Sequence, residues 1–203
     1  MVQNMKRAGG RPRSFDADAA LDRAVEVFWR CGYDGASLDE LTAAMGIGRP
    51  SLYAAFGDKQ HLFAAALKRY GETVGAMAVE AFLEASQVRD AVAAFFRVAA
   101  CNQARDGGPT GCLLACTAAS VAETQPEVRM FYATGLQAME DMLKERLERA
   151  VADGELRHGF PTGQRARLMV DLMQGLALRA RSGSTREELR SAATAYADLV
   201  LDA

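Results

Sequence analysis

The pattern of apolar and polar positions is helical along almost the whole chain. Apolar residues recur at spacings of three and four, as on one face of an α-helix, and no segment alternates convincingly as a strand would. Glycine, proline and polar cap residues separate the apolar stripes. The sequence therefore predicts an all-α protein of about nine helices, covering residues 17–31, 38–45, 49–56, 59–82, 88–105, 111–123, 126–153, 163–181 and 185–201.

The first helices are short and firmly delimited. Ser37 and Glu40 form an S-x-x-E capping box at the start of the second helix, and Gly46 ends it. The third, residues 49–56, is too short to be stable alone, yet Pro50 favours its first turn. A second capping box is expected from Ser184 and Glu187 before the last helix.

This order of elements predicts three parts. Residues 1–13 form a basic arm, residues 14–60 a compact domain of three helices, and residues 61–203 a larger helical body entered through the long fourth helix. The chain has 203 residues, half of them apolar and a quarter charged, which suffices for a small domain fused to a larger one.

Two helices joined by the Gly-Ile-Gly turn at residues 46–48 have the layout of a helix-turn-helix. The alternative is a structural αα-hairpin of no DNA affinity. In the first case the third helix lies in a major groove, held by its neighbours through Leu52 and Phe56. Arg49 then reaches guanine edges or phosphate, with Pro50, Ser51 and Tyr53 also facing outward. Lys59, at the start of the next helix, favours a phosphate.

The charge distribution agrees with a DNA-binding end. The chain has 24 basic and 26 acidic residues, a net charge of −2. Residues 1–70 nevertheless hold 10 basic and 8 acidic side chains (+2), whereas residues 71–203 hold 14 and 18 (−4). The arm has no acidic residue and four basic ones that can contact phosphates: Lys6, Arg7, Arg11 and Arg13. The alternative is that the arm is simply a charged terminus.

The segments GRPRSFD, VFWRCGYDGAS and LDELTAAMGIGRPSLYAAFGDKQHLF, within about residues 10–70, closely resemble the DNA-binding domain of the TetR/AcrR family of bacterial transcription regulators. The resemblance implies a regulator, most often a repressor, that binds a palindromic double-stranded DNA operator as a homodimer and leaves it when an effector binds. By residue, it assigns phosphate contacts to Ser37 and Lys59. The positions that match operator-facing ones are Arg49, Pro50, Ser51, Tyr53 and Ala54. Gly48 and Ala54 depart from the usual Ser and His, so base contacts depend more on Arg49 and the arm.

The last two predicted helices are amphipathic, which favours an intermolecular four-helix bundle. They can instead close the core of a single chain. The residues expected at a homodimer interface are Leu168, Leu172, Leu176, Leu189, Tyr196 and Leu199.

The middle of the body combines apolar side chains with a few polar ones, as small-molecule pockets do and as ordinary helical cores also do. The residues expected to contact an effector are Phe95, Phe96, Asn102, Gln103, Cys112, Cys116, Phe131 and Met139.

The segment TGCLLACTAAS, residues 110–120, places two cysteines one helical turn apart. If Thr110 caps this helix, Cys112 lies in its first turn, where the helix dipole lowers a thiol pKa. Cys112 and Cys116 are then either a sensor of oxidants or electrophiles, or small apolar residues in a core. The Gly111–Leu114 opening also resembles, more loosely, a branch of the family with electrophile-responsive repressors.

Catalytic and metal-binding patterns are sparse, so no enzyme, cofactor or metal is expected. His61 and His158 lack ligand spacing, and no C-x-x-C, P-loop or G-x-S-x-G occurs. No apolar run suits a membrane span or a secretory signal, so a cytoplasmic protein with free thiols is expected. Two alternatives remain: a thiol-dependent redox protein using Cys112, and a helical protein-interaction module.

Overall fold

The computed structural model of the protein describes residues 15–105 and 107–202, and within these ranges every regular element is a helix. The N-terminal part contains α1 (Ala17–Gly35), α2 (Leu38–Met45), α3 (Arg49–Phe56) and α4 (Lys59–Tyr70). The rest contains η1 (Gly71–Gly75), α5 (Met77–Glu84), α6 (Val88–Gln103), η2 (Leu114–Ala118), α7 (Ala119–Val121), α8 (Pro126–Ala152), α9 (Thr162–Arg181) and α10 (Arg186–Leu201).

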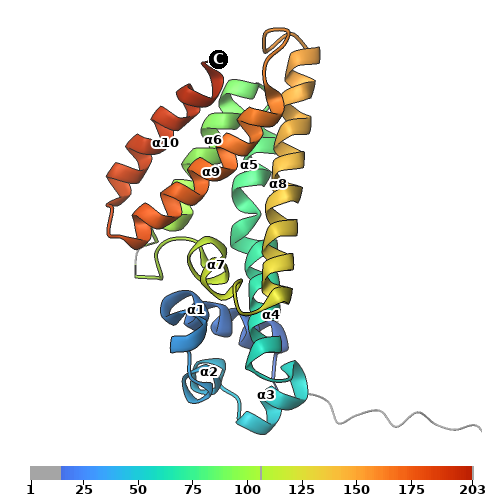
Figure 1. The fold of residues 1–203 in the computed structure, drawn as a ribbon. Coiled ribbons are helices and arrows are strands. Elements are labelled where there is room, and N and C mark those ends of the chain that lie inside the picture. The colour runs from blue at the N-terminus through green and yellow to red at the C-terminus, as the bar shows by residue number, and fades with distance from the viewer. Residues whose placement is uncertain (1–14, 106, 203) are drawn as a thin grey trace, which may run out of the picture.

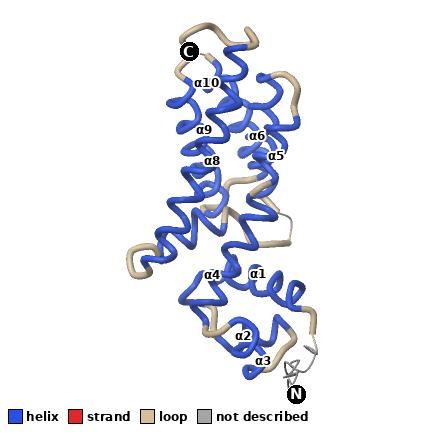
Figure 2. The backbone as a smooth tube through the Cα atoms, turned by 90° about the vertical axis from the view of Figure 1, so that its right-hand side faces the viewer, coloured by secondary structure: helices blue, strands red, loops and turns tan. Residues whose placement is uncertain are grey.

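The elements form an elongated molecule with α1–α3 at one end and the bundle of α5, α6 and α8–α10, here called the body, at the other (Figure 1). The π-helical segment η1 joins α4 to α5, and η2 leads directly into α7. Counted this way, the described residues form nine helices, and the prediction of an all-α fold is confirmed. The run from α4 to α5 passes from one end of the molecule into the other (Figure 2).

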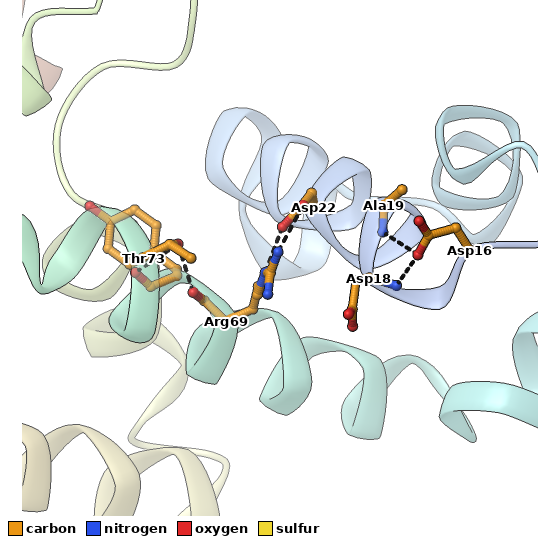
Figure 3. A network of polar contacts seen from close by, with 7 residues as sticks. Asp16, Asp18, Ala19, Asp22, Arg69 and Thr73 are labelled. Carbon is orange, nitrogen blue, oxygen red and sulfur yellow. Dashed lines mark hydrogen bonds and ion pairs between the residues drawn. The ribbon is translucent and has the colours of Figure 1, made fainter.

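The N-terminal caps hold the short helices as the sequence predicts, with one difference. Asp16 accepts hydrogen bonds from two N–H groups in the first turn of α1 (Figure 3), and Ser37 Oγ accepts one from Glu40 N–H at 3.1 Å. The Glu40 carboxylate, however, accepts a hydrogen bond from the Cys31 thiol at 3.4 Å. Gly46 adopts the left-handed conformation (φ +67°) that ends α2 and sets the turn into α3.

The capping box of α10 lies one residue later than predicted. Thr185 Oγ1 accepts a hydrogen bond from Glu188 N–H at 3.2 Å, and the Glu188 carboxylate accepts one from Thr185 N–H at 2.7 Å. The pairing predicted for Ser184 is wrong because the Ser184 N–H closes the end of α9, donating to the Arg179 carbonyl at 3.0 Å.

Buried apolar side chains form two clusters. The body core lies among α5, α6 and α8–α10. The second cluster, here called the DNA-side core, fills the space among α1–α4 around Trp29 and Phe63. It also includes three residues from the segment between α6 and α8, Leu113, Ala118 and Val121, and one from the first turn of α8, Val128. The segment η2–α7 therefore packs on the N-terminal helices, where Figure 1 shows α7 beside α1.

An ion pair also fixes α1 against α4. Arg69 donates to both carboxylate oxygens of Asp22, at 2.7 and 3.0 Å (Figure 3). This bidentate geometry restricts how the two helices rotate against each other. Among the described residues no helix is long and apolar enough to cross a lipid bilayer.

Candidate nucleic-acid interface and effector cavity

The third helix presents a polar face at the end of the molecule. Leu52 is fully buried and anchors α3 in the DNA-side core, as predicted, whereas Phe56 is only half-buried and contacts Phe15. The residues predicted to face DNA include one that is half-buried, Ser51, and four that are exposed, Arg49, Pro50, Tyr53 and Ala54.

Arg49 forms an ion pair with Asp39 in the first turn of α2. Its Nε and Nη2 donate to Asp39 Oδ1 at 3.2 and 2.8 Å, and both side chains are largely exposed. An exposed pair of this kind contributes about 1 kcal/mol or less, so a DNA base or phosphate can compete for the guanidinium. Asp39 therefore holds Arg49 at the junction of α2 and α3 without locking it there.

The other predicted DNA contacts are arranged around the starts of α2 and α4. Ser37 is exposed at the N-terminus of α2, with its hydroxyl already capping the helix. The Lys59 ammonium lies 4.6 Å from the centre of the Tyr33 ring, a cation–π contact that positions it at the start of α4. The arm residues Lys6, Arg7, Arg11 and Arg13 lie outside the described residues.

The contact between α1 and the rest of the chain centres on Trp29, which is fully buried. Its indole Nε1 donates to the Gly111 carbonyl at 3.1 Å, and its own carbonyl accepts a hydrogen bond from Arg181 at 2.9 Å. Tyr70 meets the indole edge to face at 4.9 Å, and the Arg105 guanidinium lies 5.0 Å from the ring centre. Segments 82 and 152 residues further along the chain thus meet at one residue of α1.

Gly111 fits this junction because it has no side chain. Its φ is +77°, and a Cβ there would lie 2.8 Å from the Ala177 carbonyl oxygen. The Gly111 N–H donates to the Gln103 carbonyl at 2.9 Å. Gly111 therefore connects the end of α6, a turn of α9 and the indole of Trp29 through main-chain atoms.

A cavity of about 570 Å³ opens between η1–α5, α6, η2, α8 and α9. This size is typical of small-molecule sites, and its walls are mainly apolar. Both π-helical segments contribute to it, η1 through Val74 and η2 through Leu114. Such segments are common at functional sites. Of the residues predicted to contact an effector, five line this cavity: Asn102, Gln103, Cys112, Phe131 and Met139.

Three predicted effector residues lie elsewhere. Phe95 and Phe96 are fully buried in the body core, where Phe95 contacts Phe82 and Phe96 contacts Tyr196, so they serve packing. Cys116 is half-buried and is not among the lining residues; its thiol lies 3.8 Å from the Ala177 carbonyl. Aromatic residues and cysteines alone do not reveal which face of a helix borders a cavity.

Several lining residues were missing from the sequence-based set because they come from elements that only the fold brings together. Tyr70 and Leu83 belong to the α4–α5 run, and Met173 and Gln174 to α9. Among these four residues, only Gln174 could have been recognised from the sequence, because it is a polar residue beside an apolar stripe. The Tyr132 hydroxyl donates to Gln174 Oε1 at 2.6 Å.

The lining polar groups are predominantly neutral. Burial raises the pKa of Tyr132 to about 12 and also raises that of Tyr70, so both phenols stay protonated at neutral pH. Within the described ranges, no group of three His, Cys, Asp or Glu side chains is placed to hold a metal ion.

The predicted lowering of the Cys112 pKa is wrong. The helical segment begins at Leu113, so Cys112 precedes it, and Thr110 is not its cap. The N–H groups of Leu114 and Ala115 do point at the sulfur, and Tyr70 hydrogen-bonds to it, which favours the thiolate. Burial outweighs these contacts and raises the pKa of Cys112.

The residues predicted at a dimer interface differ in how deeply they are buried within the single chain. Leu176 and Leu189 are fully buried within the single chain, so their assignment to an interface is wrong. Leu168, Leu172 and Tyr196 are half-buried against the body core. Leu199 is 50% exposed and remains available to a partner, as does Leu178, which is 56% exposed.

The fold and the polar face of α3 define a class: a helix-turn-helix DNA-binding protein whose helical body contains a largely apolar cavity. Residues 20–66 match the family described as bacterial regulatory proteins, tetR family. Residues 86–196 match the tetracyclin repressor-like C-terminal domain. The chain belongs to the TetR family of transcriptional regulators, as its resemblance in the first 70 residues implied.

Relatives agree over nearly the full length. The chain is 32% identical over 190 residues to the HTH-type transcriptional repressor ComR of Escherichia coli K12, covering 93% of this chain and 90% of that repressor. It is 29% identical over 193 residues to BdcR, another E. coli repressor, covering 93% and 91%. It also superimposes with a TM-score of 0.84 on a cysteine mutant of the regulator CifR solved with a 26-base-pair double-strand operator DNA; identity is 35%, and coverage is 92% and 98%.

Proposed function

We propose that this chain is a homodimeric repressor that binds a palindromic operator through α3 and releases it when a small molecule occupies the cavity. The observation that supports this proposal most directly is a pair of hydrogen bonds that connects the cavity lining to α1. Gln103 lines the cavity, its carbonyl accepts the Gly111 N–H, and the Gly111 carbonyl accepts the indole N–H of Trp29.

Support for operator binding comes from α3 and from relatives. Arg49 and Tyr53 are exposed at its first turns, and Ser37 and Lys59 flank them on neighbouring helices. ComR and BdcR are repressors, and CifR is bound to operator DNA in its solved structure. Residues 1–13 add four cations for phosphate contacts, and residues 14–60 form the DNA-binding domain.

The dimer we propose forms through α9 and α10, within residues 61–203, in the cytoplasm. Leu178 and Leu199 are large exposed apolar residues on these helices. Two copies would present their α3 helices to successive major-groove sites, a spacing of about 34–36 Å. A palindromic operator matches that symmetry.

We propose that the protein has two conformations and that release of the operator follows from a shift between them. A ligand in the cavity touches η1 and η2; η2 contacts α1 directly, and η1 continues α4, which packs along α1. If it prefers the arrangement in which the two α3 helices misfit the operator, occupancy shifts the population to that state. The effector acts only through this difference in affinity.

The test is a mobility-shift titration with DNA flanking the protein's own gene. Specific binding at nanomolar protein, loss on Arg49→Ala, and retention on Arg89→Ala are expected. Arg89 is an exposed arginine of α6, paired with Asp198, and serves as the matched control. Binding that is equal on operator and random DNA would contradict a repressor. The absence of binding to either DNA would favour the helical protein-interaction module.

A second candidate effector is an electrophile that reacts with Cys112, because this thiol lines the cavity. Alkylation would add bulk to the wall beside Gly111. Operator release by N-ethylmaleimide in the wild type, but not in Cys112→Ser, would support it. Peroxidase or reductase turnover lost in Cys112→Ser would instead favour the thiol-dependent redox protein.

A further inference from the structure

We propose that the cavity binds an uncharged, largely apolar ligand carrying a hydrogen-bond donor, and that Gln103 Oε1 accepts that donor. The inference concerns the chemical class of the ligand. It rests on the proposed function only for the consequence that binding has for DNA.

Gln103 is the polar side chain from which we infer a ligand with a hydrogen-bond donor. It lies at the C-terminal end of α6, is 5% exposed and lines the cavity. Its Nε2 donates to the Met173 carbonyl at 3.3 Å, while its Oε1 is buried and has no hydrogen-bond partner in the described part of the chain. The opposite amide orientation would bring two oxygens together, so the Met173 contact fixes Oε1 as the unpaired atom.

An unpaired buried acceptor is costly in the empty protein, and a ligand donor removes that cost. A ligand that lacks a donor leaves the oxygen unpaired. The cavity should therefore prefer a hydroxyl or N–H compound over its methylated analogue. Recognition of this kind discriminates more strongly than an apolar wall can.

We expect an uncharged ligand because the described residues that form the deep walls of the cavity carry no charged side chain. The deep walls are apolar residues, amides and phenols, with the Tyr132 hydroxyl already donating to Gln174. The three charged lining residues are exposed: Lys68, Glu72 and Glu80. Lys68 pairs with Glu72 at 3.7 Å. An ionised ligand would lose its hydration without gaining a buried counter-ion.

Gln103 also connects the ligand to the DNA-binding end. Gln103, whose side chain lines the cavity, also accepts the Gly111 N–H through its main-chain carbonyl, and the Gly111 carbonyl accepts the Trp29 indole N–H. A donor that draws the Gln103 side chain toward the ligand acts at the last turn of α6. Two hydrogen bonds separate that turn from α1.

Three probes of similar shape test the proposal on the full-length protein: 2-naphthol, 2-methoxynaphthalene and 2-naphthoate, each titrated calorimetrically at pH 7. We expect 2-naphthol to bind at least about fivefold more tightly than 2-methoxynaphthalene, and 2-naphthoate most weakly. Equal affinity of the first two, or tightest binding of the carboxylate, overturns the proposal.

Two variants locate the effect. In Gln103→Met the preference for 2-naphthol should fall to about one, with 2-methoxynaphthalene still bound. Asn102→Ala, which removes a neighbouring lining amide, should keep the preference. A preference that survives Gln103→Met overturns the assignment to this residue. If Gln103→Met does not fold, the wild-type order of the three probes still decides the ligand class.

Operator binding is measured separately by mobility shift without probe. Discrimination among probes by a protein that does not bind its operator would sustain the ligand class and refute the repressor. Operator binding by a protein that does not discriminate among the probes would support the repressor and refute the ligand class. The two proposals therefore fail independently.

Discussion

The indole N–H of Trp29 donates to the main-chain carbonyl of Gly111, 82 residues further along the chain, across 3.1 Å in a buried environment. Trp29 belongs to the first helix of the helix-turn-helix domain, and Gly111 adjoins the cavity residue Cys112. One hydrogen bond thus joins the DNA-binding part to the wall of the cavity.

Trp29→Phe should weaken this link while retaining an aromatic ring for Tyr70 and Arg105. The buried Gly111 carbonyl loses its partner, so the free energy of unfolding should fall by about 1–3 kcal/mol in urea titrations. Tyr132→Phe is the control, since it removes a hydrogen bond that joins α8 to α9. We expect operator affinity without effector to change in Trp29→Phe alone; unchanged affinity in both would show that the link does not couple the two parts.

Gly111→Ala should destabilise the fold more than Gly154→Ala. Both glycines have φ near +78°, so both substitutions place alanine in a strained conformation at a cost of about 1–3 kcal/mol. A Cβ at Gly154 meets nothing within 4 Å, whereas one at Gly111 meets the Ala177 carbonyl at 2.8 Å. The difference between the two melting temperatures isolates the contact with α9, and equal melting temperatures would mean that α9 yields easily.

Arg49→Ala should weaken operator binding by about 1–3 kcal/mol and relax sequence preference, if Arg49 leaves Asp39 for a base edge. Isotherms on operator and random DNA measure both. Equal loss on the two DNAs would make Arg49 a phosphate contact. Asp39→Asn releases Arg49 from its ion pair and removes an acidic side chain, so it should strengthen binding to random DNA.

Cys112 should not be the fastest cysteine to alkylate at neutral pH. Burial raises its pKa, so the neutral thiol predominates there, and its rate with iodoacetamide should keep rising as pH increases past 9. Mass spectrometry of the four cysteines between pH 6 and 10 gives the rates. A Cys112 rate that is highest of the four and flat above pH 7 would show a lowered pKa instead.

The sequence predicted the helices well because caps and glycine turns are local signals. Ser37 and Gly46 act where they were expected. It placed the capping box of α10 one residue early because two adjacent S/T-x-x-E registers overlap, and only the α9 turn selects Thr185.

The site was predicted unevenly for the same reason. The outward face of α3 follows from spacing around Leu52. The cavity does not, because its walls come from five separate segments, and Phe95 and Phe96 cannot be distinguished from cavity residues by type. For Cys112, the sequence indicated a position near the start of a helix, which lowers a thiol pKa, but it did not reveal the burial that raises it.

The DNA-side core includes Leu113, Ala118, Val121 and Val128 from beyond α6. A fragment ending at Tyr70 would expose the apolar surface that these four side chains cover. Chimaeras that graft this DNA-binding domain onto the body of another regulator must therefore carry residues 113–128 along with residues 15–70. The unit to exchange is discontinuous in sequence, although the domain looks contiguous.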